Sequence, residues 1–198
     1  MKILKAYNER HIAEAADTLR DGGVVVLPTD TIYALAVDAR NHRAIERLCR
    51  IKGIDPERQQ LSLLCADLSQ AAEYVRIDNG AFRTLRHYLP GPFTFVLPAA
   101  LRLPKMLKNR RTIGLRVPDS DAARALARAI DGPLFCASAT IDDPDELAEP
   151  ESIAMHYASL ADVLVDGGTG GTIGSTIVDL SDSSDPVVIR EGTVPFEG

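Results

Sequence analysis

The chain has 198 residues, 45% of them hydrophobic, and a formal net charge of −6. These values suit one globular domain with a substantial core and argue against a general binder of polyanions. No apolar run approaches the roughly 20 residues of a membrane span, and the N-terminus lacks a signal-peptide pattern, so we expect a cytoplasmic protein without a membrane partner.

Helical patterns alternate with short apolar runs along the chain. The helices are expected over residues 9–23, 41–53, 67–75, 79–90 and 119–132. The strands are expected over residues 24–28, 61–65, 93–98, 112–118, 133–139, 161–166, 175–180 and 186–190. Strands that alternate with helices predict an α/β fold, here a single domain over residues 1–198 with helices flanking a twisted open sheet. The closely spaced last strands indicate some antiparallel pairing and therefore a mixed sheet.

Proline ends three of the expected strands, 24–28, 93–98 and 112–118. Proline cannot donate a hydrogen bond to the next strand, so it is typical of a strand end. Ligands of open α/β sheets bind where strands end. We therefore expect the functional residues beside these stops, including the hydroxyls of Thr29 and Thr31 directly after the first one.

Positive charge is concentrated in the first two thirds of the chain. Residues 1–130 contain 21 Lys and Arg against 14 Asp and Glu, whereas residues 131–198 contain one Arg and 14 acids. Six basic residues and no acid lie between Arg102 and Arg116. This asymmetry predicts either a positive surface that attracts phosphates or an ordinary solvated face beside an acidic region.

The glycine-rich stretch 165–180, "VDGGTGGTIGSTIVDL", has two interpretations. Its backbone N–H groups could cradle an anion, or it could be a flexible connection between two strands. It is not a Walker-type loop, because no Gly-Lys-Ser/Thr occurs in it. The three cysteines, Cys49, Cys65 and Cys136, are predicted to be buried thiols in a reducing compartment. The four histidines lack metal-ligand spacing, and no metal site is expected.

A set of cations and hydroxyls beside the strand ends remains. It suits a reaction in which the protein holds and neutralises phosphate oxygens without covalent chemistry of its own. The set consists of Thr29, Thr31, Lys52, Arg116, Ser138, Thr140, Ser175 and Arg190.

Several ordered motifs carry a family resemblance. They are "LPTDTIYALAVDA", the Lys-Gly of "RIKG", "PGPFTFVL", "TIGLRVP", "CASAT", and the glycine-rich stretch followed by "VIREG". The chain resembles the YrdC-like threonylcarbamoyladenylate synthase family from about Gly22 to Gly192. "LSLLCADLS" and "IDNGAFRTLRHYLPGPFTF" resemble the YciO branch more closely than the established synthases.

The resemblance implies a sheet around a concave, positively charged cavity. It also implies a nucleotidyltransferase that converts ATP, L-threonine and bicarbonate to threonylcarbamoyl-AMP and pyrophosphate for tRNA modification, with Mg²⁺ bound to ATP. By matching position, Thr29, Thr31, Arg116 and Ser175 would bind threonine. The nucleotide and its phosphates would face Lys52, Thr112, Ser138, Thr140 and Arg190, with Lys52 and Ser138 as the catalytic residues.

Four departures from the family pattern predict a weakened or altered activity. Ile54 stands where the family has a phosphate-contacting arginine. Arg58, four residues further on, could make the phosphate contact instead. Thr140 replaces an asparagine, Cys65 a histidine and Ala34 a glycine. The alternatives are a non-catalytic protein that binds double-stranded RNA or tRNA in the same concavity, and the turnover of another small acyl-adenylate.

Overall fold

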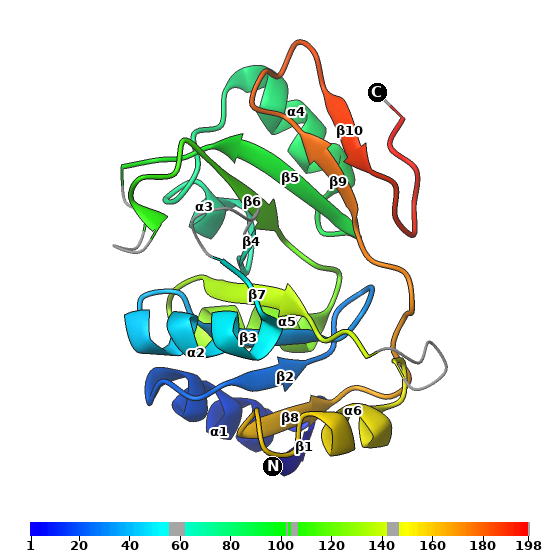
Figure 1. The fold of residues 1–198 in the computed structure, drawn as a ribbon. Helices are drawn as coiled ribbons and strands as arrows, with labels where there is room; N and C mark the ends of the chain where they lie inside the picture. Colours follow the sequence, from blue (N-terminus) through cyan, green and yellow to red (C-terminus); the bar gives the residue numbers. More distant parts are fainter. Residues whose placement is uncertain (56–61, 102, 104–106, 142–146, 198) are drawn as a thin grey trace.

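The computed structural model describes residues 1–55, 62–101, 103, 107–141 and 147–197. Ten strands of these residues form one sheet in the order β1-β8-β2-β3-β7-β4-β6-β5-β9-β10 (Figure 1). The strands are β1 Lys2–Lys5, β2 Val25–Leu27, β3 Ala34–Asp38, β4 Ser62–Leu64, β5 Phe93–Pro98, β6 Thr112–Arg116, β7 Leu134–Ser138, β8 Val163–Asp166, β9 Thr176–Asp179 and β10 Val187–Arg190. The helices are α1 Glu9–Arg20, α2 His42–Lys52, α3 Leu68–Ala71, α4 Asn79–Tyr88, α5 Asp121–Ala129 and α6 Pro150–His156.

The sheet is mixed, as the sequence predicts. β1 and β2 both run parallel to β8, β4 runs parallel to β6, and β5 runs parallel to β9. The other neighbours are antiparallel, including the expected pair β9 and β10. Figure 1 shows the resulting twist, which turns β5, β6 and β9 away from the direction of β2 and β8.

Helices cover both faces of the sheet because each central strand is apolar on both sides. Along residues 24–27, Val24 and Val26 pack into one core cluster, and Val25 and Leu27 pack into the other. This two-residue alternation is that of a strand buried on both faces. α2, α3, α4 and α6 cover the first cluster, and α1 and α5 cover the second.

The helix ends follow from local sequence. The Asn41 side chain accepts from the backbone N–H of Ala44 and caps α2, and Gly53 ends that helix in the left-handed conformation with φ +62°. Ser120 caps α5, and its side chain accepts from the backbone N–H of Ala123.

Three elements were not expected from the sequence. β1 has one buried residue, Leu4, and so lacks an apolar run. β3 is buried throughout but contains two alanines, which have little preference for strands. α6 is seven residues long, begins with Pro150 and has no side-chain cap. No helix among the described residues is long and apolar enough to span a membrane.

Candidate functional site

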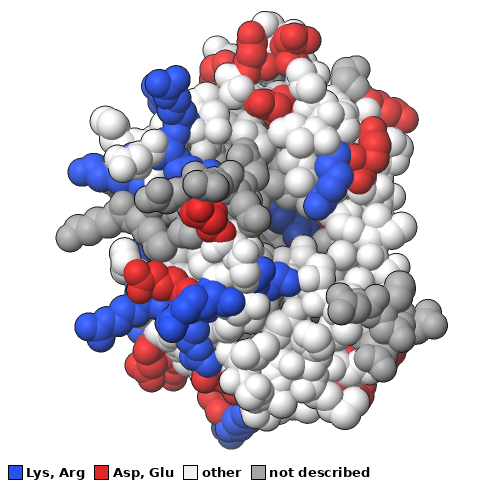
Figure 2. Space-filling view, in the orientation of Figure 1, with Lys and Arg blue, Asp and Glu red and all other residues white. Residues whose placement is uncertain are grey.

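A cavity of about 330 Å³ lies where strand ends and one helix end converge. Six of the ten predicted site residues line it: Lys52, Arg116, Ser138, Thr140, Ser175 and Arg190. The other lining residues are Ala34, Ile54, Ser62, Thr94, Cys136, Ala137 and Ile177. Figure 2 shows a hollow between the upper and lower parts of the molecule with Lys and Arg side chains within it. The predicted concave basic cavity is therefore present.

Arg116, at the end of β6, is the most buried cation of this cavity. Its Nη2 donates to Asp30 Oδ1 at 2.8 Å and to Thr31 Oγ1 at 3.1 Å. The side chains of Arg116 and Asp30 are only 12% and 10% exposed. Burial lowers the pKa of Arg116, and the Asp30 carboxylate opposes that shift. Arg116 Nε is buried and has no hydrogen-bond partner among the described residues, so it keeps a donor for a ligand.

The run of polar residues after β2 forms a turn and reaches the cavity. The Thr29 hydroxyl accepts from Thr31 N at 3.1 Å and donates to the Ile32 carbonyl at 2.8 Å, which makes it part of a turn. Thr31 is 2% exposed and reaches the cavity through its contact with Arg116. Asp30, between the two threonines, was not predicted as a site residue.

Lys52, in the last turn of α2, faces the same cavity from the other side. Its Nζ donates to Thr140 Oγ1 at 2.6 Å, and the Thr140 carbonyl accepts from the hydroxyl of buried Tyr157 at 2.8 Å. Burial lowers the pKa of Lys52, and none of the described carboxylates raises it. The ammonium group is therefore held by a neutral partner.

Ser175 and Arg190 line a third side of the cavity. The Ser175 hydroxyl lies 2.8 Å from the Thr94 hydroxyl. The backbone carbonyl of Ser175 accepts from Arg190 Nη2 at 2.7 Å. Both hydroxyl-bearing residues are less than 5% exposed. Thr94 was missed by the sequence analysis; the signal was a hydroxyl placed between Phe93 and Phe95 in an otherwise apolar strand.

The glycine-rich stretch packs against the segment after β2. The backbone N–H of Gly167 donates to the Tyr33 hydroxyl, and that of Gly171 donates to the Thr31 carbonyl. The N–H groups of Gly168 and Gly170 also donate to protein oxygens. Because these four donors are occupied, the structure favours the connecting role over the anion cradle.

The predicted site residue Thr112 lies elsewhere. Thr112 is at the start of β6, opposite Pro98 and at the other end of the strand from Arg116, and it does not line the cavity. Its predicted nucleotide contact gains no support from this position. Arg58 lies outside the described residues, as do Arg102 and Lys105 of the basic segment.

The three cysteines are free thiols. Cys49 and Cys65 are buried as predicted, whereas Cys136 is partly exposed and lines the cavity. Burial raises the pKa of Cys136 to about 12 even though Arg116 acts to lower it, so the thiol is protonated at neutral pH.

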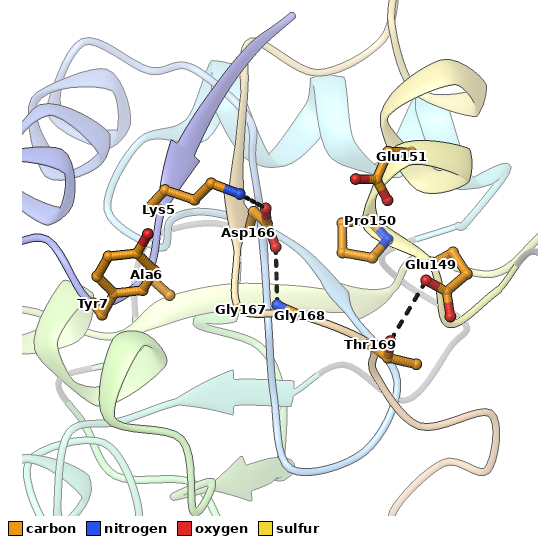
Figure 3. Close-up of a pocket in the computed structure, with 10 residues that line it drawn as sticks. All are labelled: Lys5, Ala6, Tyr7, Glu149, Pro150, Glu151, Asp166, Gly167, Gly168 and Thr169. Atoms are coloured by element: carbon orange, nitrogen blue, oxygen red, sulfur yellow. Dashed lines mark hydrogen bonds and ion pairs between the residues drawn. The ribbon is translucent and has the colours of Figure 1, made fainter.

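A second cavity, of about 570 Å³, lies at the carboxyl ends of the parallel strands β1 and β8 (Figure 3). Three carboxylates line it, those of Glu149, Glu151 and Asp166. Asp166 accepts from the Lys5 ammonium and from Gly168 N. Among the described residues, no group of three or more His, Cys, Asp or Glu side chains is arranged to hold a metal ion.

Residues 17–192 match the Sua5/YciO/YrdC family, described as "Telomere recombination". The chain belongs to this family. It is 37% identical to the YciO protein of Escherichia coli K12 over 187 residues, which cover 93% of this chain and 90% of that protein. It is 36% identical to the threonylcarbamoyl-AMP synthase of Halorhodospira halophila over 162 residues, 81% of this chain and 84% of that protein.

Solved structures of the Sua5/YciO/YrdC family have the same fold. The crystal structure of E. coli YciO superposes with a TM-score of 0.86 at 34% identity and covers 97% of this chain and 94% of that one. Pyrococcus abyssi Sua5 complexed with L-threonine gives a TM-score of 0.84 at 25% identity over 98% of this chain. This chain spans 58% of that longer protein.

Three of the four departures from the family pattern line the cavity. Ile54 lines the cavity and offers no charge, and Thr140 uses its hydroxyl to hold Lys52. Ala34 also lines the cavity, whereas Cys65 is fully buried and is not a lining residue. The cavity therefore has three cations, and the part of its wall at Ile54 is apolar.

Proposed function

We propose that the cavity binds ATP together with L-threonine and forms threonylcarbamoyl-AMP from them and bicarbonate, at a rate lowered by the departures in its wall. One observation carries this proposal: Lys52, Arg116 and Arg190, from three separate parts of the chain, line one hollow together with several hydroxyls. Fixed cations of this kind stabilise the charge that develops on transferring phosphates.

The chemistry needs no nucleophile from the protein. Bicarbonate and the threonine amine condense to a carbamate and water. A carbamate oxygen then forms a bond to the α-phosphorus of ATP, the bond to the bridging oxygen breaks, and pyrophosphate leaves. Arg116 would hold the threonine carboxylate, and Lys52 and Arg190 would neutralise the phosphates. Mg²⁺ enters as the counter-ion of ATP.

The apolar wall supports the lowered rate. An arginine at position 54 would donate charged hydrogen bonds to a phosphate, and Ile54 donates none. A charged hydrogen bond contributes about 1.5–3 kcal/mol, so its loss corresponds to a rate about tenfold to a hundredfold lower.

The experiment measures pyrophosphate release in the presence of ATP, L-threonine and bicarbonate, with each omitted in turn. The wild type should release pyrophosphate only when all three are present, and more slowly than the Halorhodospira synthase assayed beside it. Lys52→Ala should abolish the release, and Lys2→Ala, which removes a lysine at the far edge of the sheet, should not. Equal release by wild type and Lys52→Ala would exclude catalysis in this cavity.

The alternative of double-stranded RNA as the ligand stays a prediction. Within the described residues, no observation favours it over a nucleotide, because Arg116 of the basic segment is buried and paired with Asp30. A titration with double-stranded RNA at two salt concentrations tests it, since backbone recognition weakens steeply with salt.

A further inference from the structure

The three cations of the cavity differ in how they are neutralised. Arg116 is paired with the Asp30 carboxylate at 2.8 Å. Lys52 donates to a hydroxyl and Arg190 to a carbonyl. The ion pairs found between described residues include none to Lys52 or Arg190. Of the three cations, only Arg116 therefore has a carboxylate partner among the described residues.

Asp30 is fixed in place by more than its arginine. Its Oδ1 accepts from Arg116, and its Oδ2 accepts from the backbone N–H of Asp119 at 2.8 Å, just before α5. Thr31, the next residue, accepts from the same Arg116 nitrogen. Because both carboxylate oxygens are held and the side chain is only 10% exposed, its negative charge stays beside Arg116.

This arrangement separates anions by their charge. A singly charged carboxylate can use the remaining Arg116 donors as directed hydrogen bonds. A phosphate or pyrophosphate, with two or more charges, would meet the fixed Asp30 carboxylate in a poorly solvated place and be repelled. At Lys52 and Arg190, the same anion meets two cations that have no carboxylate partner among the described residues.

We propose that Asp30 is a specificity-determining residue that reserves Arg116 for a carboxylate and directs phosphates to Lys52 and Arg190. The inference rests on the proposed function in one respect, that the carboxylate is that of L-threonine. It assigns a role to a residue that touches neither substrate and acts through Arg116.

The test uses Asp30→Asn, which keeps the side-chain shape and removes the charge. L-Threonine and pyrophosphate are titrated separately into wild type and variant by calorimetry. We expect the affinity for pyrophosphate to rise about tenfold in the variant, because the repulsive charge is gone. The ratio of L-threonine affinity to pyrophosphate affinity should fall by at least the same factor. A purely structural role for Asp30 would instead weaken both ligands together and would overturn the proposal.

A competition experiment on the wild type needs no variant and stands even if Asp30→Asn does not fold. Saturating pyrophosphate should leave L-threonine affinity unchanged within about twofold, because the two anions are held by different cations of the cavity. Direct competition between them would overturn the proposal. Asp119→Asn, which removes an equal but largely exposed charge beside Asp30, is the matched control and should leave both affinities unchanged.

The two proposals fail in distinguishable ways. A wild type that binds pyrophosphate but not L-threonine contradicts the proposed function, while the pyrophosphate affinities of wild type and Asp30→Asn still decide the role of Asp30. A wild type that binds both anions, with a variant unchanged toward pyrophosphate, contradicts only the role of Asp30. Binding of neither anion by the wild type overturns both.

Discussion

Two cavities of this protein carry charges of opposite sign. The larger one, at the ends of β1 and β8, is lined by three carboxylates and by one lysine, Lys5, that is already paired with Asp166 (Figure 3). The smaller one is lined by three cations and several hydroxyls, and the Asp30 carboxylate beside it is paired with Arg116. An anion such as a triphosphate is repelled by the first and attracted by the second.

This difference teaches that volume does not identify the site. The acidic cavity has about 570 Å³ and the basic one about 330 Å³, yet the basic one joins residues of all the family motifs, whereas the acidic one includes part of the glycine-rich stretch alone. Segments 29–31, 52–54, 136–140 and 174–175 are far apart in sequence and meet there or beside it. The experiments below test whether the two cavities are as different in function as they are in charge.

The largest effect is expected from Arg116→Ala. The substitution removes the donor that we propose for threonine and leaves the Asp30 carboxylate buried without its cation. We expect L-threonine binding to be lost and the free energy of unfolding to fall by about 3 kcal/mol, as for other broken buried ion pairs. Calorimetric titration and urea denaturation measure the two effects. Arg111→Ala, at an exposed position just before β6, is the control and should change neither.

Tyr33→Phe tests whether the two cavities are independent, because Tyr33 lies between them. Its hydroxyl accepts from Gly167 N and donates to the Gly168 carbonyl, and both glycines line the acidic cavity. Losing two buried hydrogen bonds should lower the free energy of unfolding by about 2 kcal/mol, while threonine-dependent pyrophosphate release persists. Loss of release in a folded variant would mean that the basic cavity depends on the acidic one.

The same tyrosine predicts a pH dependence. Burial raises the pKa of Tyr33 to about 12 from its ordinary value of 10.0, so the folded state binds this proton more tightly than the unfolded state. The contribution is fully present below pH 10 and is lost as the pH rises from 10 toward 12. Thermal melts should show a smaller decline over this range for Tyr33→Phe than for wild type. Tyr7→Phe, at a side chain that is 85% exposed, should behave as wild type does.

Ile54→Arg sharpens the assignment of the basic cavity by adding the charge that its wall lacks. If the apolar wall limits the rate, threonine-dependent pyrophosphate release should increase about tenfold. That factor corresponds to the free energy of one charged hydrogen bond. Ile54→Gln, which is polar without charge, is the matched control and should give little increase. A release unchanged by the arginine would show that Ile54 does not limit the rate.

Much of the fold was predictable because local signals agreed with it. Asn41 and Gly53 delimit α2 as the sequence indicates, and the apolar run 93–98 is a strand. The pairing of the strands was less accessible. Of the closely spaced last strands, β9 and β10 pair with each other, but β8 joins β1 and β2 at the opposite end of the sheet. Long-range pairing of this kind has no local signature in a single sequence.

The residues of the candidate site were likewise only partly predictable from the sequence. The cations and hydroxyls of the cavity were predictable from strand ends and family motifs, and six of them meet there. Asp30 and Thr94 were missed, because each acts through a partner, Arg116 or Ser175, that lies more than 80 residues away in sequence. Thr112 was included because of its motif, but the direction of β6 places it at the end away from Arg116.

The smallest effect is expected from Asp166→Asn in the acidic cavity. Burial alone would raise the pKa of Asp166, but the bonds from the Lys5 ammonium and Gly168 N lower it on balance. The carboxylate therefore stabilises the fold at neutral pH, and this contribution is lost as the pH falls below 3.8, so any difference in melting temperature between wild type and variant should vanish in acid. Pyrophosphate release should stay within about twofold of wild type, because Asp166 does not line the basic cavity and its charge is paired with Lys5. A larger change in release would mean that the acidic cavity takes part in the reaction, and the contrast between the two cavities would then describe two parts of one site.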